Sequence, residues 1–284
     1  MVATPAKFGK TRYDVIIVGG GPAGLFAAFY LCENARFKVL IVEKGKGPLK
    51  RKCPINKNMK CVKCRPCDIL SGVGGAGLFS DGKLNFIHKL GKTDLTQFMS
   101  LQKAQELVCE TENIFNKFGM DGKVYPTDME TAKNIRKKAK RHGIDLLITR
   151  QKHLGSECLP GYISDMVEYI RSKGVVIHTS EEAKDVIIED GQIKGIVTNR
   201  KKYFSNNIIL APGRVGADWI GKLALKYGIE RSQRGIEVGL RIEVHNDIMQ
   251  DLCEIIYDPT FFIQTSKYDD QTRTFCTNSG QGRY

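Results

Sequence analysis

The chain has 284 residues, enough for one large domain or two ordinary ones. Its hydrophobic content of 42% and charged content of 26% are typical of a globular protein, and no apolar run approaches the ~18 residues that span a bilayer. The net charge of +13 is not accompanied by a helix-turn-helix, finger or RNA-recognition pattern. These totals argue against a membrane or nucleic-acid partner, and the absence of an apolar secretory segment at the start favours a cytoplasmic location.

The first predicted elements are a strand, a turn, a helix and a second strand within residues 13–45. A β-branched apolar run at 13–18 predicts a buried parallel strand, and the apolar segment "PAGLFAAFYLC" predicts a helix. The run "KVLIV" predicts a second buried strand. Between the first strand and the helix, Gly19, Gly21 and Gly24 have the G-x-G-x-x-G spacing. Together these elements predict a dinucleotide-binding βαβ unit.

Each residue type in this unit has a physical role. Gly19 allows the tight turn, Gly21 lets the main chain approach a pyrophosphate, and Gly24 lets the helix pack against the strand. The N–H groups at the helix start, with their partial positive charge, then face the phosphates. Glu43, nineteen residues after Gly24, is placed to accept hydrogen bonds from ribose hydroxyls. The predicted cofactor residues here are Gly19, Gly21, Pro22, Ala23, Gly24, Glu43 and Lys44.

A cysteine-rich loop comes next at residues 53–67, with the spacing C-x7-C-x2-C-x2-C. In a reducing compartment such a cluster favours a metal or redox site over structural disulfides. Thiolate sets of this kind suit zinc or an iron–sulfur cluster. A dithiol–disulfide element and a loop without chemistry remain the alternatives. The predicted metal ligands are Cys53, Cys61, Cys64 and Cys67.

A second G-x-G-x-x-G occurs at Gly72, Gly74 and Gly77, directly after the cysteines. It lacks a convincing preceding strand, and Asp81-Gly82 would break any helix after it, so it is not a second dinucleotide turn. Glycine-rich main chain can still press against a flat or charged ligand. A lysine beside the redox-active part of a bound cofactor would offset the negative charge that develops when the cofactor is reduced. We therefore predict further cofactor contacts at Gly74, Gly75, Ala76, Gly77, Ser80, Asp81 and Lys83. The alternative is that the segment "FSDGKL" is a polar turn that binds no ligand.

Three helices and a set of short strands are predicted next. Helices are expected at 94–118, at 127–143 with Thr127 and Glu130 as a capping box, and at 160–174. Residues 175–199 predict strands around an Asp190-Gly191 hairpin turn. The strand at 207–211 ends in Ala211-Pro212-Gly213, which adds Ala211 and Gly213 to the predicted cofactor site. A last strand is expected in "EVGLRIEVHND", residues 237–247.

A meander followed by an apolar strand ending in A-x-G is similar to the FAD-binding domains of the glutathione-reductase type. The chain resembles the bacterial and archaeal family of uncharacterised FAD-dependent dehydrogenases, through "DVIIVGGGPAGLFAA", "CVKCRPCDILSGVGGAGLFSDGKL", "RHGIDLLITRQKHLGSE", "NIILAPGR" and the segment that starts "GIEVGLRIEVHNDIM". The resemblance covers nearly the whole chain. Relatives continue past "TNSGQGRY" and return to the FAD domain, so the resemblance implies a truncated member.

The expected fold is therefore α/β. It consists of a Rossmann-type FAD-binding domain at 1–220, with the cysteine loop 53–67 and the helical segment 94–145 inserted, and the beginning of an α+β substrate domain at 221–284. The expected activity is FAD-dependent electron or hydride transfer through flavin N5, with a small-molecule substrate or redox partner and NAD(P)H as a candidate donor. The alternative is a non-catalytic nucleotide- or metal-binding fragment.

Overall fold

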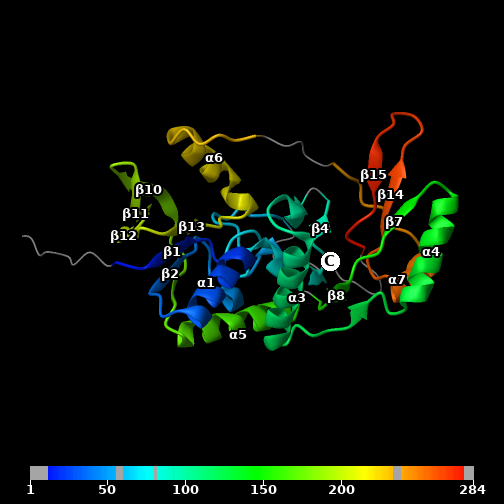
Figure 1. Ribbon diagram of the computed structural model, residues 1–284, viewed down its shortest axis with the longest axis horizontal. Helices are drawn as coiled ribbons and strands as arrows, with labels where there is room; N and C mark the ends of the chain where they lie inside the picture. The colour runs from blue at the N-terminus through cyan, green and yellow to red at the C-terminus, as the bar shows by residue number, and fades with distance from the viewer. Residues whose placement is uncertain are drawn as a thin grey trace, which may run out of the picture. The chain divides into compact units, whose positions relative to one another are not determined.

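The computed structural model describes residues 12–55, 60–79, 82–91, 93–155, 157–232 and 238–277. The chain divides into two compact units, one formed by residues 1–79 and 159–234 and the other by residues 80–158 and 235–284. Each unit is discontinuous in sequence and is described by itself (Figure 1). None of the helices in the described segments is both long and apolar enough to cross a bilayer.

The first unit is built on a parallel sheet with the strand order β13-β1-β2-β9. The strands are β1 (Val15–Val18), β2 (Val39–Val42), β9 (Val176–His178) and β13 (Ile208–Leu210). Ile16 of β1 lies opposite Leu40 of β2 and Ile208 of β13. Every residue of β1 and β2 is buried, as the short β-branched runs in the sequence predict for strands covered on both faces.

Two helices pack together in this unit, α1 (Pro22–Asn34) and α5 (Leu159–Ser172). The Phe29 ring of α1 stacks on the Tyr169 ring of α5, with 5.8 Å between ring centroids. Helix α1 follows β1 directly and approaches it closely, because Gly24 lies against the side chain of Ile17. The α1 and α5 helices confirm two of the helices predicted from the sequence.

A three-stranded meander packs on the parallel sheet. It consists of β10 (Ala183–Glu189), β11 (Gln192–Thr198) and β12 (Lys202–Phe204). One core cluster joins the two sheets and contains Ile16 and Leu40 together with Ile196 and Tyr203. The predicted hairpin turn joins β10 to β11, and both of its residues, Asp190 and Gly191, have positive φ angles. This confirms the parallel sheet with an added meander.

A further helix and three short 3-10 turns are other described elements of the first unit. Helix α6 (Ala217–Lys226) follows the 3-10 turn η4 (Arg214–Gly216), and its Trp219 indole donates a hydrogen bond to the Lys184 carbonyl. Two further 3-10 turns are η1 (Pro48–Lys50) and η2 (Ala76–Phe79). The turn η1 precedes the cysteine-rich loop, and η2 contains Gly77 at the end of the second glycine-rich loop.

In the described residues of the second unit, three helices occur together with small antiparallel sheets. The helices are α3 (Leu101–Lys117), α4 (Met129–Arg141) and α7 (Asn246–Ile255). One sheet has the order β15-β14-β7, from β7 (Asp145–Leu147), β14 (Thr260–Gln264) and β15 (Gln271–Arg273). A second has the order β3-β8-β6, from β3 (Lys83–Asn85), β6 (Val124–Tyr125) and β8 (Gln151–His153). The shorter elements are β4 (Lys89–Leu90), β5 (Thr93–Asp94) and η3 (Leu95–Gln97).

The observed division differs from the one expected at residue 220. The helical segment 94–145 interrupts the first unit in sequence but belongs to the second unit, where β7 pairs with β14 more than a hundred residues later in the chain. Leu146 of β7 joins Ala132 and Ile256 in a separate core. Helix α6 stays with the first unit, so the last crossing between the units falls near residue 234. Long-range strand pairing of this kind leaves no mark in local sequence patterns.

Two further expectations were wrong. Residues 238–245 form no strand, and the apolar side chains that suggested one are exposed, with Val238 at 86% and Ile242 at 80%. An alternating pattern becomes a strand only when a partner strand supplies the hydrogen bonds. The N-cap of α4 is Asp128, whose carboxylate accepts the Glu130 N–H, whereas the Thr127 hydroxyl donates to the Glu254 carbonyl. The N-cap therefore lies one residue later than predicted, and the side chain three positions after it is Thr131, whose hydroxyl donates to Asp128, rather than the Glu130 of the predicted capping box.

Candidate nucleotide-binding site

The predicted fingerprint turn lies at the carboxyl end of β1. Gly19 has a φ angle of +108°, and its N–H donates to the Val42 carbonyl of the neighbouring strand at 2.9 Å. A β-carbon at Gly19 would collide with the carbonyl oxygen of Ala211, and one at Gly24 would collide with the carbonyl oxygen of Gly19. Both glycines are therefore required by packing. This arrangement also brings Ala211, predicted from the strand at 207–211, next to the turn.

Gly21 is different, because its missing side chain leaves space. It is the N-cap of α1 in an extended conformation, and a β-carbon there would meet only the Gly75 Cα, at 3.6 Å. Pro22 and Ala23 after it are exposed. The first turn of α1 has neither an acidic residue nor a side-chain cap. The positive end of the helix is thus open, and the site fits the diphosphate of a dinucleotide.

Glu43 lies at the end of β2 and is tied to the turn. Its side chain accepts hydrogen bonds from the N–H groups of Gly20 and Gly45, both at 2.8 Å, and the residue is only 7% exposed. A carboxylate offers about four lone-pair positions, so two remain for ribose hydroxyls. Lys44 beside it is partly buried. The structure therefore brings the predicted acid to the fingerprint.

The second glycine-rich loop packs against the first. The Gly74 N–H donates to the Gly20 carbonyl at 2.8 Å, and the Gly75 Cα faces Gly21. Neither a regular strand before this loop nor an α-helix after it occurs in the described segment 60–79. The loop main chain thus forms one wall beside the fingerprint, where Ala76 and Gly77 are exposed.

Arg51 holds this loop and was missed by sequence reasoning. The residue is 3% exposed, and its guanidinium donates to the carbonyls of Asp68, Ile69, Val73 and Gly75 at 2.8–2.9 Å. Burial lowers the pKa of Arg51, and the nearby Glu43 and Asp68 carboxylates oppose that shift. In the sequence Arg51 stands between two lysines, and no sequence signal distinguishes it from an exposed residue of a basic run.

The other predicted site residues divide into three groups. Gly213 is exposed at the start of η4 in the first unit. Ser80 and Asp81 lie outside the described residues. Lys83 is in β3 of the second unit, where its ammonium pairs with the buried Asp258 carboxylate. Since Lys83 already has a carboxylate partner, its expected contact with a flavin stays a prediction.

The four cysteines of the loop are described, and all of them are free thiols. Cys61 is exposed, and Cys53, Cys64 and Cys67 are partly buried. Among the residues that the structure describes, no three cysteine, histidine or acidic side chains are grouped closely enough to hold a metal ion. The structure does not assemble the expected metal cage, so a zinc or iron–sulfur site stays a prediction.

The parallel sheet, the added meander and the open glycine turn define a Rossmann-type FAD-binding domain, the fold class expected from the sequence. Residues 13–125 match the model of the family described as pyridine nucleotide-disulphide oxidoreductase. This match supports the class predicted above, an FAD-dependent oxidoreductase family. The matched range contains the fingerprint, Glu43, the cysteine loop and the second glycine-rich loop.

Individual relatives share short or distant similarity. Glucose oxidase of Penicillium chrysogenum is 44% identical over 45 residues, which are 16% of this chain and 8% of that protein. An L-amino acid deaminase from Proteus vulgaris is 17% identical with a TM-score of 0.45, over 78% of this chain and 57% of that one. Glycine oxidase from Bacillus cereus is 17% identical with a TM-score of 0.43, over 77% and 59%. The chain thus spans less than two thirds of each of these relatives.

Proposed function

We propose that the chain binds FAD at the Gly19–Gly24 turn and takes part in electron or hydride transfer as an FAD-dependent oxidoreductase. The observation that carries this proposal is the open α1 terminus at Gly21, with Glu43 tied to the same turn. The turn amides would hold the diphosphate, and the free lone pairs of Glu43 would accept the ribose hydroxyls.

The protein's contribution is binding and orientation. Bound FAD would supply redox chemistry at flavin N5, as flavins do in other oxidoreductases. Gly19 and Gly24 keep β1 and α1 close enough for the turn to form, and Arg51 fixes the wall at residues 68–75. The substrate is proposed to be a small molecule or a redox partner, with NAD(P)H as a candidate donor.

The test is a visible absorption spectrum of the purified chain after incubation with FAD and removal of free flavin. We expect flavin bands that elute with the protein and bleach with dithionite. A protein that stays colourless at saturating FAD would overturn the proposal. Metal analysis of the same sample tests the cysteine prediction, and a colourless protein that contains zinc would favour the non-catalytic binding fragment.

A further inference from the structure

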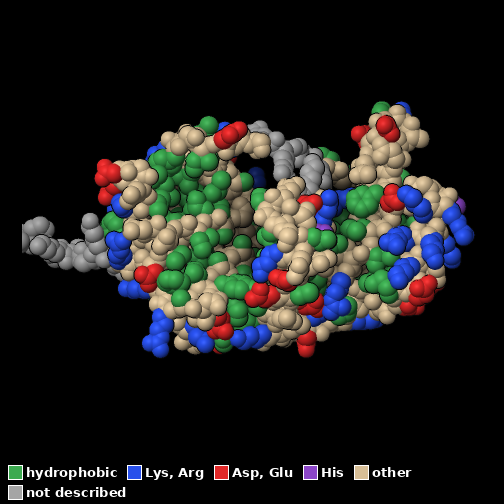
Figure 2. Space-filling model, in the orientation of Figure 1, with side chains coloured by type: hydrophobic (Ala, Val, Ile, Leu, Met, Phe, Trp, Pro, Cys, Tyr) green, Lys and Arg blue, Asp and Glu red, His purple; other side chains and the backbone are tan. Residues whose placement is uncertain are grey.

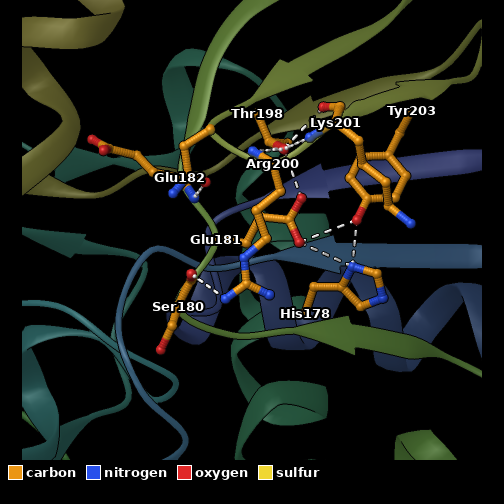
Figure 3. A network of polar contacts seen from close by, with 9 residues as sticks. His178, Ser180, Glu181, Glu182, Thr198, Arg200, Lys201 and Tyr203 are labelled. Carbon is orange, nitrogen blue, oxygen red and sulfur yellow. Dashed lines mark hydrogen bonds and ion pairs between the residues drawn. The ribbon is translucent and has the colours of Figure 1, made fainter.

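A buried carboxylate, Glu181, lies between β9 and β10 and has no part in the fingerprint. The residue is 1% exposed. The Thr198 hydroxyl donates to its Oε1 at 2.6 Å, and the Tyr203 hydroxyl donates to its Oε2 at 3.1 Å. His178 Nδ1 lies 3.2 Å from the same oxygen. Figure 3 shows these side chains, from β9, β11 and β12, converging on Glu181.

The main chain of the same segment brackets Glu43. The Glu43 N–H donates to the His178 carbonyl at 2.9 Å, and the Glu181 N–H donates to the Glu43 carbonyl at 3.0 Å. The Ser180 N–H donates to the Gly45 carbonyl at 2.8 Å. Because the Glu43 side chain in turn accepts from Gly20, a continuous path of hydrogen bonds joins Glu181 to the fingerprint turn.

The segment needs an anchor to hold this shape. Ser180 has a φ angle of +54°, a left-handed conformation that is unfavourable for a residue other than glycine. Its carbonyl accepts a hydrogen bond from Arg200 at 2.9 Å. A buried carboxylate must keep its donors, so Glu181 fixes the segment to the meander. Burial, together with Glu181, raises the pKa of Tyr203, so its hydroxyl remains a donor across the ordinary pH range.

We propose that Glu181 is a positioning residue for nucleotide binding: its carboxylate locks segment 178–181 to the meander, and that segment holds Glu43 in place for the ribose. The proposal rests on the proposed function, because it concerns the affinity for FAD. In this proposal Glu181 acts only through Glu43, because its N–H donates to the Glu43 carbonyl and its carboxylate accepts hydrogen bonds from the meander. Its effect on affinity therefore depends on the presence of the Glu43 carboxylate.

A double-mutant cycle tests this dependence. FAD affinity is measured by titration of flavin fluorescence for the wild type, Glu43→Gln, Glu181→Gln and the double variant. We expect each single change to weaken binding about tenfold, or ~1.4 kcal/mol. In the Glu43→Gln background, Glu181→Gln should cost less than about twofold. Equal losses in both backgrounds, or no loss from Glu181→Gln alone, would overturn the proposal.

Two controls separate positioning from general destabilisation. Asp185→Asn removes a partner of Lys226 and Tyr227 elsewhere on the meander, and should leave FAD affinity within about twofold. If Glu181→Gln does not fold, Tyr203→Phe and Thr198→Val each remove one donor and should each weaken binding in the wild type but not in Glu43→Gln. Retention of wild-type affinity by both would refute the proposal.

A ligand-free measurement distinguishes this proposal from the proposed function. The Gly20 and Gly45 amides are protected by the Glu43 carboxylate, so hydrogen exchange at both should accelerate in Glu181→Gln. A wild type that binds no FAD would sink the oxidoreductase assignment, and faster exchange would then still support the coupling. Unchanged exchange at both amides would sink the coupling even if FAD binds.

Discussion

At the scale of single residues, the site depends on glycines that serve two different purposes. Gly19 and Gly24 lack side chains because neighbouring carbonyl oxygens occupy the space, whereas Gly21 lacks one where the space is open. The sequence motif does not separate these roles, since all three positions read as glycine. A methyl group added at Gly19 or Gly24 should therefore disturb the packing of the turn, whereas one added at Gly21 should leave the packing intact and enter the open space.

Gly21→Ala should weaken FAD binding about tenfold or more, because the added methyl group would enter the space predicted for the diphosphate. The fold should survive with a loss of about 1 kcal/mol, since any residue can adopt the extended conformation of Gly21 although alanine is a poorer N-cap than glycine. Gly47→Ala is a matched control, because Gly47 is also an N-cap before proline and has open space around it. Flavin titration and denaturant unfolding of both variants measure the contrast, and equal affinities would contradict the diphosphate site.

Arg51 provides a second prediction at this scale. Arg51→Lys keeps the positive charge but loses most of the donors that reach the buried carbonyls of residues 68–75. Carbonyls left without donors should lower the free energy of unfolding by about 3 kcal/mol. Urea unfolding of the variant would check this, with Lys50→Arg on the exposed neighbour as the control. A loss below about 0.5 kcal/mol would mean that charge alone holds the loop.

At the scale of elements, the start of α4 shows that a local sequence signal can predict a helix correctly and still misplace its N-cap by one residue. The expected capping box placed Thr127 at the N-cap of the helix predicted at 127–143, but Asp128 caps α4 and also accepts from the Thr131 hydroxyl. Thr and Asp both occur often at N-caps, so residue type alone does not decide between Thr127 and Asp128. Asp128 caps the helix because the Thr127 hydroxyl instead donates to the Glu254 carbonyl near the end of α7.

Asp128→Ala should therefore destabilise α4 by about 1 kcal/mol. Asp128→Asn keeps an acceptor oxygen at the N-cap and should recover most of that loss. Hydrogen exchange of the first-turn amides of α4, compared between the two variants, measures the effect locally. If the alanine variant shows exchange like that of the wild type, then Asp128 is not the stabilising cap.

At the scale of the whole molecule, the second unit carries a cluster of exposed basic side chains on α4 and also contains ion pairs with buried acids. Figure 2 shows Lys and Arg side chains gathered over α4. The exposed basic residues of this helix are Lys133, Arg136, Lys137, Lys138, Lys140 and Arg141. Two buried acids among the described residues of the same unit have basic partners. Asp258 pairs with Lys83, and Glu112 pairs with Arg150 and Lys152.

These pairs predict acid sensitivity of the second unit. Burial opposes ionisation of Asp258, but the hydrogen bonds from Lys83 and Thr277 and the charge of Lys83 together outweigh burial and lower the pKa of Asp258. The Arg150 hydrogen bond likewise lowers the pKa of Glu112. Unfolded Asp and Glu titrate near 3.9 and 4.3, so the stabilisation is complete above about pH 5 and is lost as pH falls through the lower native values.

Urea midpoints between pH 7 and pH 3 should fall with pH, and the dependence should be shallower in Asp258→Asn. That variant should also be less stable at pH 7 by about 3 kcal/mol, because it removes the buried carboxylate of the Asp258–Lys83 ion pair. Asp218→Asn, at an exposed i,i+4 pair, serves as the control and should retain the wild-type profile. An identical pH profile in Asp258→Asn would exclude this pair as a source of acid sensitivity.

The sequence by itself determined the dinucleotide turn, the buried parallel strands, the hairpin at Asp190-Gly191 and the position of Glu43 at a strand end. Those features depend on spacing and periodicity within about thirty residues, and local sterics enforce them. Only the tertiary structure decided that β7 pairs with β14, that residues 238–245 form no strand, and that the four cysteines, all in described segments, do not gather. It also decided that Arg51 and Glu181 are buried beside the site. These outcomes depend on contacts between segments far apart in the chain, which leave no periodic signal in the sequence.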